Sequence, residues 1–135
     1  MSLITWDVSY SVNVSKCDDD HKKLFSLLNA LHGAMKVGKG RDVIQQVVKE
    51  LANYTKYHFS QEELLLSKTN YPNLAAHKAE HANFVKKVEE FQAAVKAGNM
   101  SQSIAVIGFL TDWLANHIKQ TDRQYSAHLN ASGIS

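Results

Sequence analysis

Residues 76–81 read Ala-His-Lys-Ala-Glu-His, which places two histidines four positions apart. Apolar residues follow at helical spacing, among them Phe84 and Val88, so the segment is predicted to form an amphipathic helix. His77 and His81 begin the stripe that faces the core. Because a buried polar group is costly without a partner, the two imidazoles need a partner that the apolar stripe does not supply.

The composition is that of an ordinary globular domain. The chain has 135 residues, 44% of them apolar and 21% charged, as expected for one domain with a single core. A formal net charge of +2 with dispersed lysines favours neither nucleic acid nor an anionic membrane as a partner. The longest apolar run, residues 104–110, is too short to span a bilayer.

Cysteine usage and the start of the chain predict a cytoplasmic protein. Cys17 is the only cysteine, so it forms no internal disulfide, which fits a reducing compartment. We interpret it as a small apolar filler rather than a reactive thiol. No charged-then-apolar leader opens the chain. The sequence shows no exposed apolar stripe, which predicts a monomer.

Apolar periodicity predicts four long helices in a single domain covering residues 1–135. The expected helices cover about 18–37, 41–68, 74–97 and 101–129. Asp18 and Ser101 are the expected N-caps of the first and fourth, and three stop or turn signals separate the helices: Gly38-Lys39-Gly40, Asn70-Tyr71-Pro72-Asn73 and Gly98-Asn99. Short connections predict an all-α, up-down-up-down antiparallel four-helix bundle.

Residues 1–17 precede the first predicted helix and alternate between apolar and polar side chains. Such alternation is typical of a strand, but the sequence offers no second strand to pair with it. We therefore expect an extended N-terminal arm that lies on the helices.

Placed on this bundle, seven ionisable side chains fall at one end, because helices one and three start level with the ends of helices two and four. They are His21, His58, Glu62, His77, His81, His117 and Asp122. Residues four apart lie about 40° apart around a helix and can address one centre, whereas residues five apart diverge by about 140°. Spacing alone therefore does not select Asp122, although a single π-turn would ease its geometry. His32 and His128 lie about 16 Å further along their helices and are assigned to packing or solvent.

Five imidazoles and two carboxylates at one buried level predict a metal site. Without partners each would cost several kcal/mol, more than a domain stable by about 5–15 kcal/mol tolerates. Imidazole and carboxylate are metal ligands, and seven are too many for one ion. In two six-coordinate sites the histidines would supply five bonds, two bridging carboxylates four and a shared oxygen two. One position stays open for a small exogenous molecule.

Further residues surround this set in a fixed order along nearly the whole chain. The motifs are Trp6-Asp7-Val8 with Tyr10-Ser11-Val12, His21-Lys22-Lys23-Leu24, His58-Phe59 with Glu62-Glu63, His77-Lys78-Ala79-Glu80-His81, and Trp113 with His117-Ile118 and Asp122. In this order they resemble the hemerythrin family, specifically the single-domain bacterial hemerythrins. The bundle topology is likewise one for which a member of this family is a standard example.

The resemblance implies a non-haem di-iron centre and reversible binding of O2, for storage, transport or delivery rather than catalysis. By position, one iron would be held by His77, His81 and His117 and the other by His21 and His58, while Glu62, Asp122 and an oxo or hydroxo group would bridge the two irons. The resemblance selects Glu62 over Glu63 and also selects Asp122. In hemerythrins O2 binds at the open iron of the diferrous form, takes one electron from each iron, and leaves when this transfer reverses.

The resemblance also implies a dry, apolar pocket around the open position. Our candidates for its lining, which can equally be ordinary core residues, are Leu24, Phe25, Phe59, Leu114 and Ile118. Residues 18–20 read Asp-Asp-Asp, whereas relatives often have Gln directly before the first ligand histidine. We expect Asp20 to be exposed in the first helical turn, where it suits the helix dipole; contact with the His21 side is the alternative.

Two other functions would use the same site. An oxygen or redox sensor would need a separate partner, because no second domain follows before Ser135. A di-metal oxidase, peroxidase or zinc hydrolase is the other alternative. The repeated Glu-x-x-His motif of the bundle oxidases is absent from the sequence, and nitrogen-rich ligation favours holding O2 over activating it. Nitric oxide and peroxide remain open as ligands, and only the resemblance favours iron over zinc.

Overall fold

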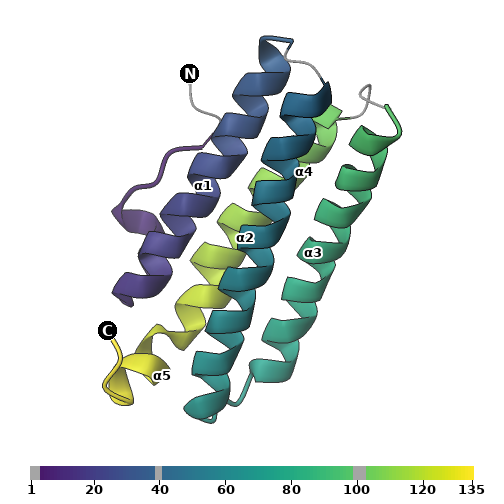
Figure 1. Ribbon diagram of the computed structural model, residues 1–135. Helices are drawn as coiled ribbons and strands as arrows, with labels where there is room; N and C mark the ends of the chain where they lie inside the picture. Colours follow the sequence, from purple (N-terminus) through teal and green to yellow (C-terminus); the bar gives the residue numbers. More distant parts are fainter. Residues whose placement is uncertain (1–3, 39–40, 99–102) are drawn as a thin grey trace.

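Four antiparallel helical rods make up the computed structural model, which describes residues 4–38, 41–98 and 103–135. The first three rods are α1 (Ser15–Lys36), α2 (Arg41–Lys68) and α3 (Leu74–Lys96), and the fourth consists of α4 (Ser103–Asn116), η2 (His117–Thr121), η3 (Asp122–Tyr125) and α5 (Ser126–Ala131). The rods run up, down, up and down, and α1 and α3 each pack against both α2 and α4 (Figure 1). The predicted all-α four-helix bundle is confirmed. No helix in the described ranges is both long and apolar enough to cross a bilayer.

The apolar stripes meet along the bundle axis. Leu24, Leu28 and Leu31 of α1 are fully buried, as is Phe84 of α3. On α2, Val48 and Thr55 are fully buried, whereas Val47 and Tyr54 are only partly covered. The latter two still pack against the apolar core.

The N-terminal arm is less extended than expected. The Asp7 carboxylate accepts a hydrogen bond from the backbone N–H of Ser9 (2.8 Å), which closes the short 3-10 helix η1 (Val8–Tyr10). Helix α1 then begins at Ser15, earlier than the predicted start at residue 18, and its N-cap Val14 makes no side-chain bond. A turn closed by the Asp7 side chain is therefore present where the sequence predicted extended chain.

Asp18 is not the N-cap that the sequence predicts. It lies inside α1 and reaches back to the arm, accepting hydrogen bonds from the Val12 N–H (2.9 Å) and the Ser11 hydroxyl (2.7 Å). The Ser126 hydroxyl donates to the Val12 carbonyl (2.6 Å). The arm is thus tied both to the first turn of α1 and to the start of α5.

The fourth rod departs from the expected continuous helix over 101–129. After α4 it widens into the π-turn η2, tightens into the 3-10 turn η3 and returns to α-helix in α5. The predicted cap Ser101 lies outside the described residues. The π-turn and the 3-10 turn contain His117 and Asp122, so the change of winding sets the orientation of these two site residues.

Two of the predicted stop signals act through left-handed glycines. Gly38 (φ +72°) follows the end of α1, and its N–H donates to the Met35 carbonyl (3.2 Å); Gly98 (φ +84°) follows α3. The other residues of these signals, 39–40 and 99, lie outside the described ranges. Glycine adopts this conformation without the steric cost that a Cβ brings.

Replacing either of two glycines near the end of α1 by alanine should change the free energy of unfolding, but in opposite directions at the two positions. Neither position has an atom within 4 Å of an added Cβ, so only the backbone conformation decides. Gly33→Ala, inside the helix, should raise the free energy of unfolding by about 0.5–1 kcal/mol. Gly38→Ala should lower it by about 1 kcal/mol. Urea unfolding at equal metal occupancy measures both; a shift of the same sign in the two variants would contradict this account.

Candidate metal centre

All seven predicted ligands lie together at one end of the bundle. Each is at most 3% exposed, and together they come from all four rods: His21, His58, Glu62, His77, His81, His117 and Asp122. The two histidines assigned elsewhere are only partly buried. One of them, His128, donates from Nε2 to the Thr69 carbonyl (2.8 Å) and so joins α5 to the end of α2.

Glu62 stands between two groups of histidines. Its Oε1 lies 2.7 Å from His77 Nε2 and 3.1 Å from His81 Nε2. Its Oε2 lies 3.2 Å from His58 Nε2 and 3.6 Å from His21 Nε2. One carboxylate therefore presents one oxygen to each group. We call His77, His81 and His117 the three-histidine group, and His21 and His58 the two-histidine group.

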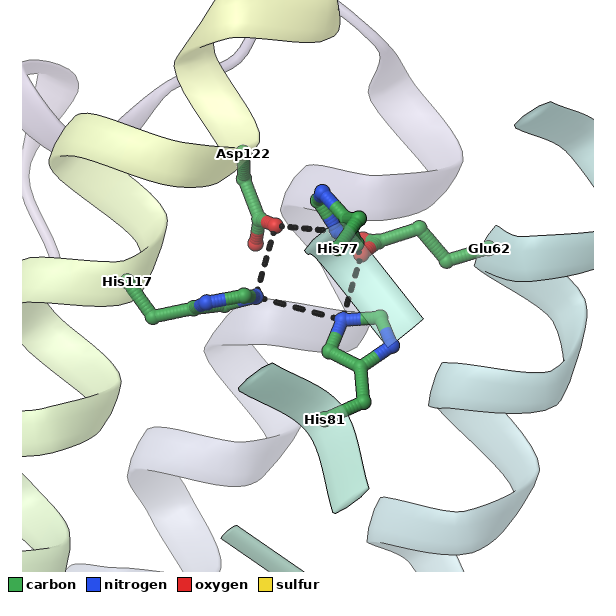
Figure 2. A group of neighbouring side chains, drawn as sticks. All are labelled: Glu62, His77, His81, His117 and Asp122. Atoms are coloured by element: carbon green, nitrogen blue, oxygen red, sulfur yellow. Dashed lines mark hydrogen bonds and ion pairs between the residues drawn. The ribbon is translucent and has the colours of Figure 1, made fainter. Parts of the chain in front are cut away.

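Asp122 repeats this division from the opposite rod. Its Oδ1 lies 3.0 Å from His77 Nε2 and 2.9 Å from His117 Nε2, while its Oδ2 lies 3.2 Å from His21 Nε2. Figure 2 shows Asp122 and Glu62 facing the three-histidine group from two sides. Donor atoms of this group and both carboxylates lie within 4.8 Å of one another, as do those of His21, His58 and Glu62.

The π-turn explains how His117 and Asp122 face the same point. The Asp122 N–H donates to the carbonyl of His117, five residues earlier, which is the π-helical bond pattern. The wider turn brings residues five apart onto one face, whereas an α-helix would turn them about 140° apart. The π-turn that the sequence left as a possibility is therefore present.

Three outer carboxylates hold the far nitrogens of the imidazoles. His81 Nδ1 lies 2.8 Å from Glu63, His117 Nδ1 lies 3.1 Å from Glu80, and His58 Nδ1 lies 2.9 Å from Asp20. An ionised carboxylate only accepts hydrogen bonds, so each Nδ1 carries a hydrogen; in the neutral ring that binds a metal, Nε2 then turns its lone pair inward. Such outer partners are typical of metal-bound histidines.

Asp20 is buried, so the predicted exposure of this residue is wrong. It is 3% exposed rather than solvent-facing, and it accepts hydrogen bonds from His58, from the Tyr54 hydroxyl (2.8 Å) and from Lys16 (3.0 Å). Burial alone would raise the pKa of Asp20, but these three donors outweigh it and lower the pKa to about 2. The residue lies on the inner side of α1, one position before His21.

Two further residues were missed as parts of the site. Glu80 sits inside the opening motif and is fixed by the Thr121 hydroxyl (2.9 Å) as well as by His117. The Tyr125 hydroxyl donates to Glu62 Oε2 (2.9 Å). The sequence signal for Tyr125 was only its place in the apolar stripe, because its hydrogen bond crosses from the fourth rod to α2.

The inward-facing atoms suit bound metal ions. His81 Nε2 and His117 Nε2 lie 3.1 Å apart, and with both Nδ1 atoms protonated two lone pairs face each other. Both nitrogens of His21, together with His58 Nε2 and Asp122 Oδ1, are buried without a hydrogen-bond partner. Cations among these atoms would satisfy them, and neutral imidazole with carboxylate suits a divalent transition metal.

The electrostatics of the cluster also favour cations. Burial would lower the pKa of His58 and of His77. Glu62 outweighs burial at His58 and raises its pKa to about 10. Asp122 and Glu62 together do the same at His77, whose pKa is also raised to about 10. Burial and the charge of Glu62 would raise the pKa of Asp122, but the neighbouring histidines outweigh both and hold that pKa well below its ordinary value. Two buried carboxylates thus create a negative potential at this level, and a metal ion gains from it as a proton does.

Aromatic rings wall the three-histidine group. Phe59 stacks on His81 at a centroid distance of 3.7 Å, and Trp113 stacks on His117 at 4.6 Å. The five predicted pocket-lining residues, Leu24, Phe25, Phe59, Leu114 and Ile118, are all buried; their lining role stays a prediction. Cys17 is buried too, and burial strongly raises the pKa of its thiol, which agrees with a filler rather than a reactive thiol.

Comparison with known proteins agrees with this geometry. The family model "Hemerythrin HHE cation binding domain" matches residues 12–129. The bacteriohemerythrin of Methylococcus capsulatus is 35% identical over 132 residues, or 97% of this chain and 100% of that protein. The hemerythrin-like protein of Naegleria gruberi is 33% identical over 128 residues, or 95% of each chain. A crystal structure of wild-type hemerythrin has a TM-score of 0.88 at 35% identity, covering 95% of this chain and 98% of that one.

A four-helix bundle with a buried cluster of histidines and carboxylates defines a class of helical cation-binding proteins. Within that class, this chain belongs to the hemerythrin family.

Removing an inward-facing imidazole should cost metal. His77→Ala and His81→Ala each delete a donor that faces Glu62, so we expect metal content to fall by at least about half and the unfolding temperature to drop. His32→Ala is the matched control, because His32 lies outside the cluster. Elemental analysis of the three purified proteins measures the effect. Equal metal content in all three would contradict the assignment.

Proposed function

We propose that this chain binds dioxygen reversibly at a pair of iron ions held at the buried end of the bundle. The proposal rests on the orientation of the Glu62 and Asp122 carboxylates. Each of them turns one oxygen toward the three-histidine group and the other toward the two-histidine group. When bound, such an iron pair supplies the two electrons that reversible oxygen binding requires. Membership of the hemerythrin family supports iron as the metal and dioxygen as its ligand.

The donor atoms differ in number between the two sides. The three-histidine group with Glu62 Oε1 and Asp122 Oδ1 offers five donors, whereas the two-histidine group with Glu62 Oε2 and Asp122 Oδ2 offers four. One oxo or hydroxo group shared between the sides would bring them to six and five. An open position would then remain on the two-histidine side, and this is where the small ligand is expected to enter.

Several residues around the site are apolar. Leu24 lies one helical turn after His21, and Phe59 and Ile118 directly follow His58 and His117. A dry surround withholds the water and protons that would convert a reversible ligand into a reduced product. We therefore propose that the buried residues Leu24, Phe25, Phe59, Leu114 and Ile118 line the ligand pocket.

A nitrogen-rich donor set supports holding dioxygen rather than cleaving it. Five of the seven inward-facing side chains are imidazoles, in contrast to the carboxylate-rich sets of bundle oxidases. We accordingly propose a carrier or store of oxygen rather than an enzyme, acting in the cytoplasm as a monomer.

The first test is an absorption spectrum recorded through one oxygenation cycle. Protein reduced without air should be colourless, gain a visible band on exposure to oxygen, and lose it on purging. Irreversible conversion to the oxidised spectrum would favour a sensor or an enzyme instead. A protein that carries metal but shows no visible band in any state would point to zinc.

Opening the apolar pocket should shorten the life of the oxygenated protein. Leu114→Ala and Ile118→Ala remove buried apolar groups beside His117, and admitted water should speed autoxidation at least about threefold. Leu31→Ala is the matched control, a fully buried leucine ten residues along α1 from His21. It should lose similar stability, about 2–5 kcal/mol, with an unchanged lifetime. Decay of the visible band measures all three, and unchanged decay in both pocket variants would remove the lining role.

A further inference from the structure

Asp20 differs from the other two outer carboxylates in burial. Its side chain is 4% exposed, whereas those of Glu63 and Glu80 are 27% and 42% exposed. Water therefore screens the charges that face His81 and His117 far more than the charge that faces His58. The difference falls on the half of the site that would keep an open position.

Its hydrogen bonds fix both the residue and the ring that it faces. Oδ2 accepts from His58 Nδ1 (2.9 Å), and Oδ1 accepts from the Tyr54 hydroxyl (2.8 Å) and from Lys16 (3.0 Å). With Nδ1 engaged, His58 Nε2 is turned toward Glu62 Oε2 at 3.2 Å. His21, the other member of this group, has no hydrogen-bond partner at Nδ1.

The counter-charge for Asp20 lies at the surface. Lys16 is 63% exposed at its side chain, so solvent weakens its compensation of the buried carboxylate. The Tyr54 hydroxyl contributes a dipole but no charge. The negative charge of Asp20 is thus separated from the open position only by the ring of His58. It also increases the electron-donating power of His58.

We propose that Asp20 is a positioning and specificity-determining residue that disfavours small anions, relative to neutral dioxygen, at the open position of the two-histidine side. It acts in two ways through His58, by orienting the ring and by placing a buried negative charge behind it. Binding of neutral dioxygen adds no net charge to the site, because the electrons that it takes come from the irons themselves, whereas an anion adds a negative charge that Asp20 repels. The inference rests on the proposed di-iron site, and it adds a basis for ligand selection that the ligand set alone does not provide.

Azide binding to the oxidised, iron-loaded protein tests the proposal. Asp20→Asn keeps the side-chain shape and an acceptor for His58 but removes the charge, so azide should bind about tenfold more tightly. Asp19→Asn removes the same charge from the neighbouring exposed position and should shift the azide Kd less than twofold. Glu63→Gln, on the three-histidine side, should also shift it less than Asp20→Asn does.

Lys16→Gln should change the azide affinity in the opposite direction. Without this cation the Asp20 charge is less compensated, so azide should bind about two- to threefold more weakly. Asp20→Ala separates orientation from charge, because it removes the acceptor as well. We expect it to lose iron, whereas Asp20→Asn should retain about the iron content of the parent protein.

These readouts distinguish a purely structural role from the proposed one. If Asp20 only ties α1 to α2, Asp20→Asn will lower the unfolding temperature and leave the azide Kd unchanged, which overturns the proposal. The same holds if Asp19→Asn tightens azide binding equally. The azide titration uses oxidised protein and does not require reversible oxygenation, so failure of the oxygen cycle with a normal azide series would count against the proposed function alone. No azide binding in any form would overturn the role of Asp20.

Discussion

Each of the two central carboxylates faces both histidine groups, and this sharing constrains the whole lower end of the bundle. Glu62 comes from α2 and Asp122 from the fourth rod, while the imidazoles they face come from every rod. Donor atoms must meet within a few ångströms, so the four rods have to agree in height and rotation at this level. The apolar end has no such requirement, since leucine and phenylalanine tolerate small shifts in packing.

The fourth rod meets this constraint by changing its winding. An unbroken α-helix would turn Asp122 away from His117, so the rod spends five residues as a π-turn and then recovers through a 3-10 turn. Both forms are less favourable than α-helix, and burial of Ile118 in the π-turn and of Tyr125 in the 3-10 turn helps to offset the loss. The arm adds support, because Ser126 just beyond the irregular segment is bonded to Val12.

The surround of the site is unequal on its two sides. The three-histidine group is backed by carboxylates in contact with solvent and by stacked aromatic rings. The two-histidine group is backed by one buried carboxylate, whose partners Lys16 and Tyr54 lie on α1 and α2. The histidines on the two sides therefore differ in the burial and the chemistry of the groups behind them.

The sequence by itself determined the four helices, their order and the level at which seven ionisable residues meet, because periodicity and stop signals are local properties of the chain. It also singled out His21, His58, His77, His81 and His117 by shared height, whereas the family resemblance selected Glu62 over Glu63. Only the tertiary structure decided the orientation of Asp122, which depends on a π-turn, and the burial of Asp20, which depends on α2 bringing Tyr54 and His58 against α1. The partners of Glu63, Glu80 and Tyr125 likewise lie on other rods. A helical pattern shows which face a residue occupies, whereas its partner across an interface is set by the rotation and register of two packed helices.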